Sequence, residues 1–571
     1  MRGRSCRRPI VIFVKWNSLT KLQDRETKSG SLVSDLRSST RRSDLLAGQA
    51  SFTFSLRSLW DERAVISRVV LVDAEVNLER RADGLRNWRL RDPEYAGPGR
   101  VKVVALEAHR TKLQVTNHAI ELHFAAAASD PPPDAARAPT LKNRIEFSGA
   151  YRKAKFSGVT LAGEVVTLRD SGTSFPVQGH MQWGGTRVEV DGDLTDVLEL
   201  AAVDAKVRFS GSSLAGLHPI LPFRFPETRR YVMDARLKRS GDETSLAGIR
   251  AKFGDSDLAG EGSLKRLEPR SLLRAALRSN SADIEDLMAR PGVAPGDPGR
   301  LFSKEKLGIG RVGAIDAQIG FEAKRLKAGD TLVLENLRLA AGLDDGMLQV
   351  KPLDFGLAGG RASVSLTLDA RQEPFAGKVT ASFRQLSLER LFPATAAKTH
   401  ASGLVDGRLQ LAGRGDSVAA LLGSASGSAD AAMGRGRISN LADAKLALNA
   451  GKILGLWLRG DRDIDILCAA AGFDFSNGAG RARVLTLDTE QTRTDGSGSI
   501  DLRAEKFALQ LSSTPKKPAL LALGGGVHVE GTFRHAKFSV IPGKDAVAVS
   551  SASCAGRQVA LLGASAEAKA R

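Results

Sequence analysis

Apolar and polar residues alternate in short runs near the end of the chain. Between residues 472 and 540, Phe473 and Phe475 have polar neighbours, and so do Ile500 and Leu502. A period of two is typical of a strand with one apolar and one solvated face. Turn-forming residues separate the runs at Ser476-Asn477-Gly478, Asp495-Gly496 and Ser512-Ser513-Thr514-Pro515. The pattern therefore predicts an antiparallel meander whose neighbouring strands are joined by short turns.

The same alternation recurs upstream, for example in residues 65–79, 101–124, 154–191 and 403–411. The sequence FGDSDLAGEGSL, residues 253–264, predicts a further hairpin that turns at Gly254. Few stretches favour helices, and they are residues 212–217, 282–287, 386–392 and 441–458. The chain is therefore predicted to be mainly β, an antiparallel sheet of many strands with a few short helices.

Changes in composition divide the chain. Residues 291–312 are rich in Gly, Pro and charge, which predicts a linker between an N-terminal half, 46–290, and a C-terminal half, 313–542. The Ala- and Ser-rich residues 543–571 are predicted to be a flexible tail. Residues 1–45 differ from both halves. Their apolar run, residues 10–14, is far shorter than the ~20 residues that span a bilayer. They are predicted to be disordered or a truncated anchor.

Composition agrees with many strands and turns. The chain has 571 residues, 42% of them hydrophobic and 5% aromatic, with 58 glycines. Its net charge of +19 is spread along the whole length and interleaved with acids. This distribution favours a solvated basic surface, or attraction to anionic lipid head groups, over a nucleic-acid site. No zinc finger, helix-turn-helix or aromatic RNA-binding motif accompanies the charge, so no nucleic-acid partner is predicted.

Candidate metal and nucleotide sites are weak. A shared metal would need His109, His118 and His123 on one face, but the last two point oppositely in a regular strand. Asp255 and Asp257 suit a turn better than a calcium loop. Residues 413–417 lack the third glycine of a nucleotide-binding loop. No metal or cofactor is predicted.

Cysteines and catalytic motifs add little chemistry. Cys6, Cys468 and Cys554 are too few and too scattered for a disulfide framework, and Cys468 is predicted to be a small buried apolar residue. Trp88 is predicted to be an aromatic residue in the core or at the rim of a hairpin. Motifs of serine hydrolases, zinc proteases and P-loop enzymes are absent from the sequence. The chain is predicted not to be an enzyme, with no catalytic residue.

Several motifs near the C-terminus occur in a fixed order. They are Phe473-x-Phe475, Leu487-Asp488-Thr489, Asp495-Gly496-Ser497-Gly498-Ser499-Ile500-Asp501-Leu502, Pro515-Lys516-Lys517 and Val529-x-Gly531-Thr532. This series resembles the C-terminal signature of the AsmA family of bacterial envelope proteins. The sequence departs from that signature after Thr532, where Arg534-His535-Ala536 stands in place of a proline. The resemblance covers roughly residues 60–540.

The resemblance implies a function and a location. Family members are normally anchored in the inner membrane with most of the chain in the periplasm. Their sheet is thought to curl into a long trough, like that of chorein-type bridge proteins, that conducts phospholipid between membranes. We therefore expect a curled, taco-like β-groove that shields or transfers phospholipid between inner and outer membranes and supports outer-membrane homeostasis. The expected partners are phospholipid and the two membrane surfaces.

Other interpretations stay open at this stage. The alternation also fits a sheet closed around a filled core, and the residues alone do not separate groove from core. A second functional hypothesis is a periplasmic scaffold that assists outer-membrane protein assembly through exposed sheet edges, without carrying lipid. A basic nucleic-acid-binding protein is the third. The strand residues that are candidates for lining a groove are Val484, Ile500, Leu509 and Leu511, and the sequence assigns no single lipid site.

Overall fold

The structure is a computed structural model, and it describes most of the chain. The described residues are 25–26, 32–34, 45–54, 64–83, 101–103, 105–130, 141–163, 165–167, 174–195, 202–217, 227–287, 300–307, 315–329, 332–392, 400–440, 443, 462–516, 525–533, 535–542 and 554. They form two compact units. Unit 1 comprises residues 1–211 and 236–241, and unit 2 comprises residues 212–235 and 242–571.

Unit 1 is a sheet of mostly antiparallel strands. Its strands are β1 (Arg25–Glu26), β2 (Leu32–Ser34), β3 (Leu45–Phe54), β4 (Ala64–Arg80), β5 (Val101–Val103), β6 (Ala105–His109), β7 (Lys112–Asn117), β8 (Leu122–Ser129), β9 (Asn143–Tyr151), β10 (Ala154–Ala162), β11 (Val165–Thr167), β12 (Phe175–Trp183), β13 (Thr186–Thr195) and β14 (Ala202–Gly211). The exceptions are β5, β6 and β7, which all pair with β4 in parallel. From β7 to β14 the pairing is antiparallel, and β10 pairs with both β9 and β12. Strand β15 (Tyr231–Ser240) contributes residues to both units.

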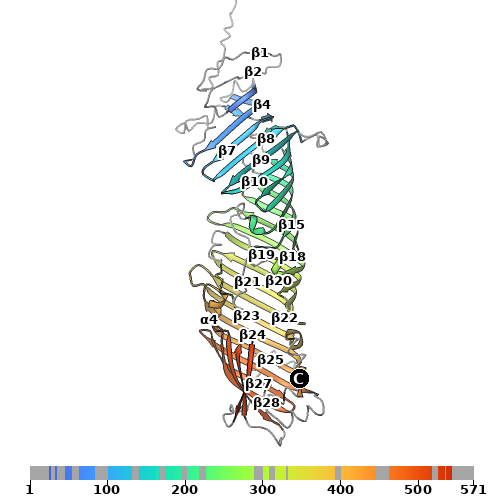
Figure 1. Ribbon diagram of the computed structural model, residues 1–571, viewed down its shortest axis with the longest axis vertical. Helices are drawn as coiled ribbons and strands as arrows, with labels where there is room; N and C mark the ends of the chain where they lie inside the picture. Colours follow the sequence, from blue (N-terminus) through green and yellow to red (C-terminus); the bar gives the residue numbers. More distant parts are fainter. Residues whose placement is uncertain are drawn as a thin grey trace, which may run out of the picture. The chain divides into compact units, whose positions relative to one another are not determined.

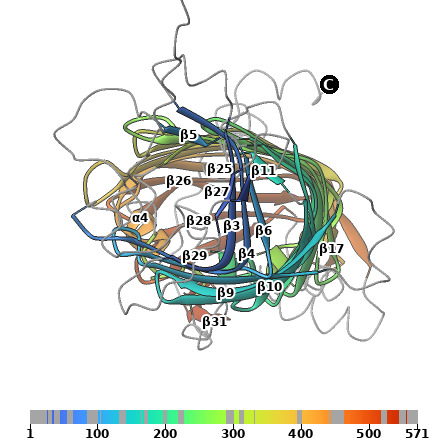
Figure 2. The same cartoon turned by 90° about the horizontal axis from the view of Figure 1, so that it is seen from above.

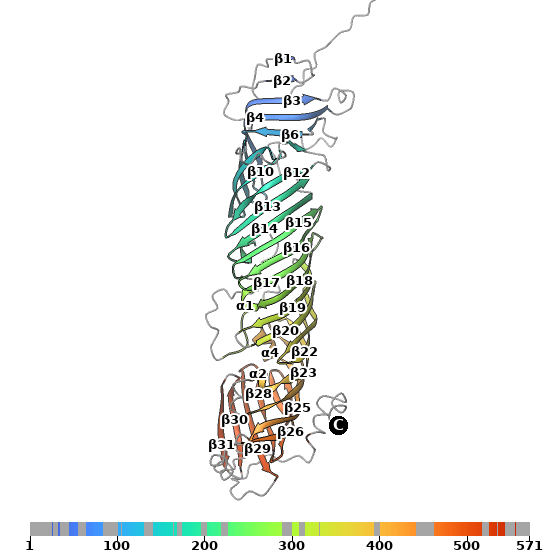
Figure 3. The same ribbon diagram turned by 90° about the vertical axis from the view of Figure 1, so that its right-hand side faces the viewer.

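Unit 2 continues the same architecture. Its strands are β16 (Glu243–Phe253), β17 (Ser256–Lys265), β18 (Ser271–Asp283), β19 (Ile315–Ala328), β20 (Leu332–Asp344), β21 (Met347–Leu357), β22 (Gly360–Asp369), β23 (Ala376–Ser387), β24 (Ser402–Arg414), β25 (Ser426–Ser439), β26 (Asp463–Ser476), β27 (Ala479–Thr489), β28 (Thr492–Asp501), β29 (Lys506–Pro515), β30 (Gly525–Thr532) and β31 (His535–Pro542). Each strand is hydrogen-bonded to the next in sequence, and β18–β19 is a parallel pair among antiparallel ones. Figures 1 and 3 show these strands side by side.

Helices in the described part of the chain are few and short. They are η3 (Leu214–Leu217), α1 (Ile284–Leu287), α2 (Leu388–Leu391) and α4 (Val418–Gly423). Seen from above, the strands bend, so that each sheet is curled (Figure 2). The predicted mainly-β, curled antiparallel fold with a few short helices is confirmed. None of the helices in the described ranges is long and apolar enough to cross a membrane.

Turn chemistry explains two of the predicted hairpins. Asn477-Gly478 joins β26 to β27, as predicted, and both residues have positive φ, 49° and 80°. Gly254-Asp255 joins β16 to β17 in the predicted hairpin, so Asp255 has the predicted turn position. Asp257, also predicted to lie in the turn, lies instead inside β17, where it accepts hydrogen bonds from the backbone N–H groups of Asn280 and Ser281 at 3.1 and 2.8 Å. It therefore holds β18 beside β17.

Two predicted turns are wrong. Asp495-Gly496 lies inside β28, and residues 512–515 lie inside β29, where Asp495 pairs with Ser512. The chain turns instead at residues 490–491 and 502–505. Gly496 has a packing role, because a Cβ at this position would lie 2.6 and 2.7 Å from side-chain atoms of Leu485 and Leu511. A glycine in a strand can thus mark a close approach rather than a turn.

Several predictions lie wholly or largely outside the described residues. They concern residues 1–45 apart from β1, β2 and Leu45, the role of Trp88, the helix over 441–458 apart from Asp443, and the tail 543–571 apart from Cys554. The division into halves at residues 291–312 also stays a prediction. Within the described chain, the short helices predicted near residues 212–217, 282–287 and 386–392 are present as η3, α1 and α2.

Candidate functional site

One face of the unit 2 sheet is apolar without interruption. Residues that are direct partners on neighbouring strands share a face, so consecutive partners define a row across the sheet. The central row contains only apolar residues and one glycine. Its members are Ile249, Gly260, Leu277, Phe321, Leu339, Leu353, Val364, Ala381, Leu409, Ala429, Phe473 and Ala482. The row crosses every strand from β16 to β27.

A second apolar row lies beside the first and reaches β30. Its members are Leu246, Gly262, Ala275, Ile319, Ala341, Val350, Leu366, Val379, Leu411, Gly427, Phe475, Gly480, Ile500, Phe507 and Gly531. The row between them, on the other face, is polar where it passes through Ser365, Thr380, Gln410, Ser428 and Asp474. The alternation seen in the sequence thus produces one apolar and one polar face.

The apolar face is not sealed by the described side chains. Leu339, Leu353, Val364, Leu409 and Phe473 of the central row each keep an intermediate exposure. Residues in a close-packed core would be almost fully buried. Local buried clusters do occur, for example Met433, Ile438, Ile464 and Ile466. Between such clusters the face keeps apolar surface that an apolar ligand can cover.

Unit 1 has the same kind of face. A row of apolar residues and one glycine crosses it from β4 to β14, and its members are Val76, Leu113, Ala126, Phe147, Gly158, Met181, Val188 and Phe209. The ring of Phe147 lies over Gly158, where a Cβ would be 2.5 Å from the ring edge. Aromatic side chains therefore occupy the space that glycine leaves.

The apolar face of unit 2 contains a cavity of about 370 Å³. Almost all of its lining is aliphatic, and the residues are Leu388, Ala401, Val405, Ala431, Ala432, Met433, Ile438, Ile466, Ala469, Ala470, Ala471, Leu485, Thr486, Leu487, Thr494 and Leu511. Its volume is at the lower end of small-molecule sites, which are about 300–1,000 Å³. The cavity offers burial to an apolar chain and few groups for directional recognition.

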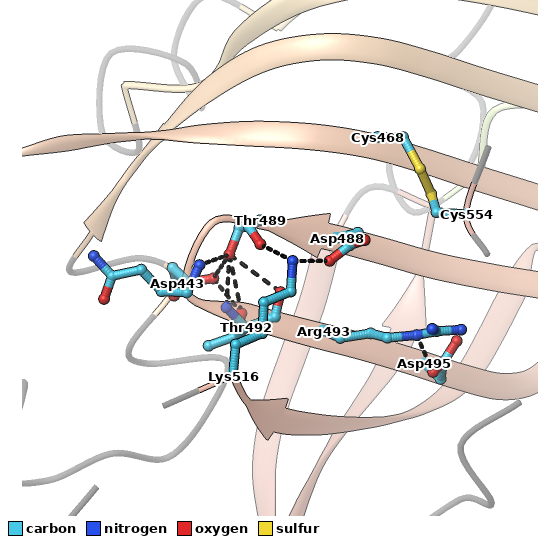
Figure 4. Close-up of polar contacts among 10 residues, drawn as sticks. Asp443, Cys468, Asp488, Thr489, Thr492, Arg493, Asp495, Lys516 and Cys554 are labelled. Atoms are coloured by element: carbon cyan, nitrogen blue, oxygen red, sulfur yellow. Dashed lines mark hydrogen bonds and ion pairs between the residues drawn. A yellow bond between two sulfur atoms is a disulfide. The ribbon is translucent and has the colours of Figure 1, made fainter. Parts of the chain in front are cut away.

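A buried polar cluster fixes the strand ends beside the cavity (Figure 4). The carboxylate of Asp443 is fully buried and accepts hydrogen bonds from the hydroxyls of Thr489, at 3.0 Å, and Thr492. Lys516 Nζ donates to the Thr489 carbonyl and lies next to Asp488 Oδ1, both at 2.6 Å. Asp488, Thr489 and Lys516 belong to the motifs of the sequence, and these contacts give them a structural role. Asp443 could not be found from the sequence, because its partners lie 46 and 49 residues away.

The prediction for Cys468 was incomplete. Cys468 is buried, as expected, but it forms a disulfide with Cys554, and their Cα atoms are 6.2 Å apart. That separation is within the usual range for a disulfide. The bond joins β26 to a residue 86 positions further on. Nothing in the spacing of the cysteines predicts this bond, and one partner lies in a segment predicted to be a flexible tail.

A second anchoring point is Glu505, in the turn between β28 and β29. Its buried carboxylate accepts from Arg300 Nε at 3.0 Å and from the backbone N–H groups of Leu301 and Phe302. The ring of Phe302 packs against the apolar cluster that contains Phe475. Burial alone would raise the pKa of Glu505, but these hydrogen bonds and the Arg300 charge outweigh it and lower the pKa. Residues 300–307, from the β18–β19 connection, are thus tied to the C-terminal strands.

We expect Glu505→Gln to lower the free energy of unfolding by about 1–3 kcal/mol at pH 7, because a charged acceptor of three donors is lost. A lowered pKa in the folded state means that the carboxylate stabilises the fold above the ordinary Glu pKa of about 4.3, and this contribution is lost as the pH falls through the folded pKa. Thermal unfolding of both proteins between pH 3 and pH 7 measures this. The difference should shrink towards pH 3, and equal midpoints at pH 7 would contradict it.

The structure places the candidate lining residues on both faces. Leu511 lines the cavity, and Ile500 packs in the cluster around Phe475. Leu509 lies two positions from Leu511 in β29 and shares its face, whereas Val484 precedes Leu485 in β27 and points to the opposite face. The four residues therefore do not form one lining.

The histidine geometry differs from the prediction. His118 lies in the turn after β7 rather than in a strand, so its ring reaches His123 with a centroid distance of 6.4 Å. His118 Nε2 is 3.1 Å from Glu79, and His109 is 3.8 Å from Glu107. No group of three His, Cys, Asp or Glu side chains suited to a metal ion occurs within the described ranges.

Comparisons with known proteins agree with the motifs. Residues 299–485 match the model of the AsmA family. Over 446 residues, 73% of this chain, the sequence is 28% identical to the AsmA family protein YhjG of Escherichia coli strain K12. The matched region spans 65% of the length of that relative. These matches, together with the ordered C-terminal motifs and the curled sheets, show that the chain is similar to members of the AsmA family.

Proposed function

We propose that this protein shields phospholipid acyl chains on its apolar sheet face and transfers phospholipid between the inner and outer membranes, without enzymatic chemistry. The observation that carries the proposal is the unbroken central row of unit 2. Twelve strands at a spacing of about 4.8 Å give a path of roughly 50 Å. That path exceeds the ~15 Å depth of one bilayer leaflet, so a whole acyl chain fits along it.

The free energy of apolar burial favours binding of an acyl chain to the sheet over its exposure to water. Exposing about 16 methylenes to water costs on the order of 13 kcal/mol, at ~0.8 kcal/mol each. A partly exposed aliphatic face removes most of this penalty, while the head group stays in water. Because the apolar contact is non-directional, affinity for different acyl chains should be similar. The aliphatic cavity in unit 2 gives one place where a chain end can be buried.

We further propose that most of the chain lies in the periplasm and is associated with the inner membrane. Similarity to the AsmA family, whose members are envelope proteins, supports an envelope location. The disulfide between Cys468 and Cys554 is consistent with it, because disulfides persist in oxidising compartments such as the periplasm. Location in the envelope would also bring the protein close to both membrane surfaces.

The lipid-carrier proposal is tested by extracting the purified full chain with organic solvent. We expect phospholipid at a stoichiometry of about one or more per protein, because apolar surface of this extent favours retention of a bound chain. Mass spectrometry of the extract identifies the lipid, and an unrelated β protein purified in the same way is the control. Extracts that contain no more lipid than the control would rule the proposal out.

A scaffold that assists outer-membrane protein assembly is the second candidate function. One observation favours it: Phe538 on β31 is 70% exposed, and β31 is the last described strand of unit 2. Strands near a sheet edge can pair with an extended segment of another chain. Site-specific cross-linking from position 538 to unfolded barrel precursors tests this. Cross-links formed by lipid-free protein would favour the scaffold over the carrier.

A further inference from the structure

A small group of aromatic and basic residues lies at one edge of unit 1. We define the rim site as Tyr151, Arg152, Lys153 and Trp183. Tyr151 ends β9, Arg152 and Lys153 form the turn to β10, and Trp183 ends β12. Because β10 pairs with both β9 and β12, these strand ends are adjacent.

The rim site connects a cation to the apolar face through ring contacts. The Arg152 guanidinium lies 5.3 Å from the centroid of the Tyr151 ring. That ring meets Trp183 edge-on at 6.2 Å, and the indole stacks on Phe156 at 5.1 Å. Phe156 in turn stacks on Phe124 at 6.3 Å. The contacting residues therefore change from a cation at the turn, through Tyr151 and Trp183, to phenylalanines on the apolar face.

Polar groups at the rim have spare binding capacity. Trp183 Nε1 is buried and has no hydrogen-bond acceptor. Arg152 and Lys153 are exposed, and neither forms an ion pair with another described residue. Among the nearby charges, Glu121 is negative, and its main-chain oxygen accepts from the Arg152 N–H at 3.0 Å. Arg80 adds a further positive charge on this edge. Its carbonyl accepts a hydrogen bond from the backbone N–H of His118 at 2.9 Å.

The turn residues are unusual for their backbone conformation. Arg152 and Lys153 have φ of 47° and 69°. Equivalent turns elsewhere in this chain use Asn477-Gly478 and Asp345-Gly346, the residue types that accept positive φ most readily. Two long cationic side chains stand here instead, at a cost in backbone strain. We therefore attribute the presence of Arg152 and Lys153 to their cationic side chains, because the turn geometry alone would favour Asn, Asp or Gly.

We propose that the rim site binds the phosphate of a phospholipid head group whose acyl chains lie on the apolar face of unit 1, and that it favours lipids with net negative charge. The proposal rests on the lipid-carrier function and adds a head-group preference to it. Arg152 and Lys153 attract the phosphate, and the Trp183 N–H donates to an oxygen of the phosphate or glycerol backbone. Phe156 and Phe124 contact the first methylenes. This order of groups matches an anionic amphiphile, and aromatic residues commonly occupy such polar–apolar boundaries.

The experiment measures capture of fluorescent phosphatidylglycerol and phosphatidylcholine from vesicles of defined composition by the purified full chain. The test variant is Arg152→Gln with Lys153→Gln. The control is Lys155→Gln with Lys206→Gln, two exposed cations on the polar face of unit 1 whose removal changes the net charge equally. We expect wild type and control to prefer phosphatidylglycerol by about tenfold at low salt, and the test variant to lose that preference.

The outcomes separate the two proposals. If the test variant keeps the wild-type preference, the rim site is wrong while lipid carriage stands. If wild type captures neither lipid, the carrier function fails, and the rim site fails with it. Trp183→Phe keeps the ring stack but removes the N–H, and it should weaken capture of both lipids by about fivefold. Unchanged capture by Trp183→Phe would exclude the indole from the site.

Discussion

Replacing Val364 by Asp should lower the rate of phospholipid transfer by at least about tenfold. Val364 lies in the middle of the central row, with Leu353 and Ala381 as its direct partners on β21 and β23. An acyl chain on this row would bury the new carboxylate without a partner. An uncompensated polar group in apolar surroundings costs about 1–3 kcal/mol, and an ionised one costs more. Transfer of a fluorescent phospholipid between donor and acceptor vesicles measures the effect.

Ser365→Asp is the matched control, because Ser365 is the next residue of β22 and points to the polar face. Both changes add one negative charge to the same strand. Val364 is partly exposed, so its Asp variant can hydrate the carboxylate and should keep the fold. We expect the control to transfer lipid at the wild-type rate. If both variants transfer equally well, the central row is not the path of the acyl chain.

One added charge is expected to have a large effect because no polar path runs beside the central row on the same face. The second row beside it is equally apolar, and the next polar residues, such as Thr380 and Gln410, face away. A filled core would respond differently. There, Val364→Asp would unfold the sheet, and loss of transfer would coincide with loss of the circular-dichroism signal of strands. Folded but inactive Val364→Asp protein is thus the outcome that distinguishes groove from core.

Alternation predicted the β architecture well because it is a local property. The face of Phe473 and Phe475, and the Asn477-Gly478 turn, follow from residues within a few positions of each other. The misplaced turn at Asp495-Gly496 has a non-local cause. Its glycine is explained by Leu485 and Leu511 on the neighbouring strands, and contacts of this kind are not encoded in the local pattern. The parallel pairing of β18 with β19 escaped prediction for the same reason.

The candidate site was predictable in kind but not in detail. The sequence predicted an apolar face, yet it named Val484 together with Leu511, which lie on opposite faces. A β-bulge in the β26–β27 pairing, between Gly472 and Phe473, shifts the alternation just there. One extra residue exchanges the two faces of a strand, so pattern counting fails beyond it. Asp443 and Glu505 were missed because their partners are far away in sequence.

Loss of the Cys468–Cys554 disulfide should destabilise unit 2 by about 2–4 kcal/mol, the usual range for a disulfide. The bond closes a loop of 86 residues that contains β27 to β31. Cross-linking such a loop restricts the unfolded chain far more than the folded one. Cys468→Ser with Cys554→Ser should therefore lower the thermal midpoint by several degrees. Differential scanning calorimetry of oxidised wild type and the double variant measures this.

Reduced wild type provides the internal control, because it keeps both sulfur atoms and loses only the bond. Its thermal midpoint should lie below that of oxidised wild type and no lower than that of the double variant, because both positions are buried and a buried serine hydroxyl costs more than a thiol. If reduction leaves the midpoint unchanged, the two cysteines are not bonded in the protein. The comparison also bears on location. A chain that gains stability from this bond gains it only where thiols are oxidised, as they would be at the proposed periplasmic location. Because β27, β28 and β29 supply Leu485, Leu487, Thr494 and Leu511 to the cavity, the same bond would help to keep the apolar site formed in that compartment.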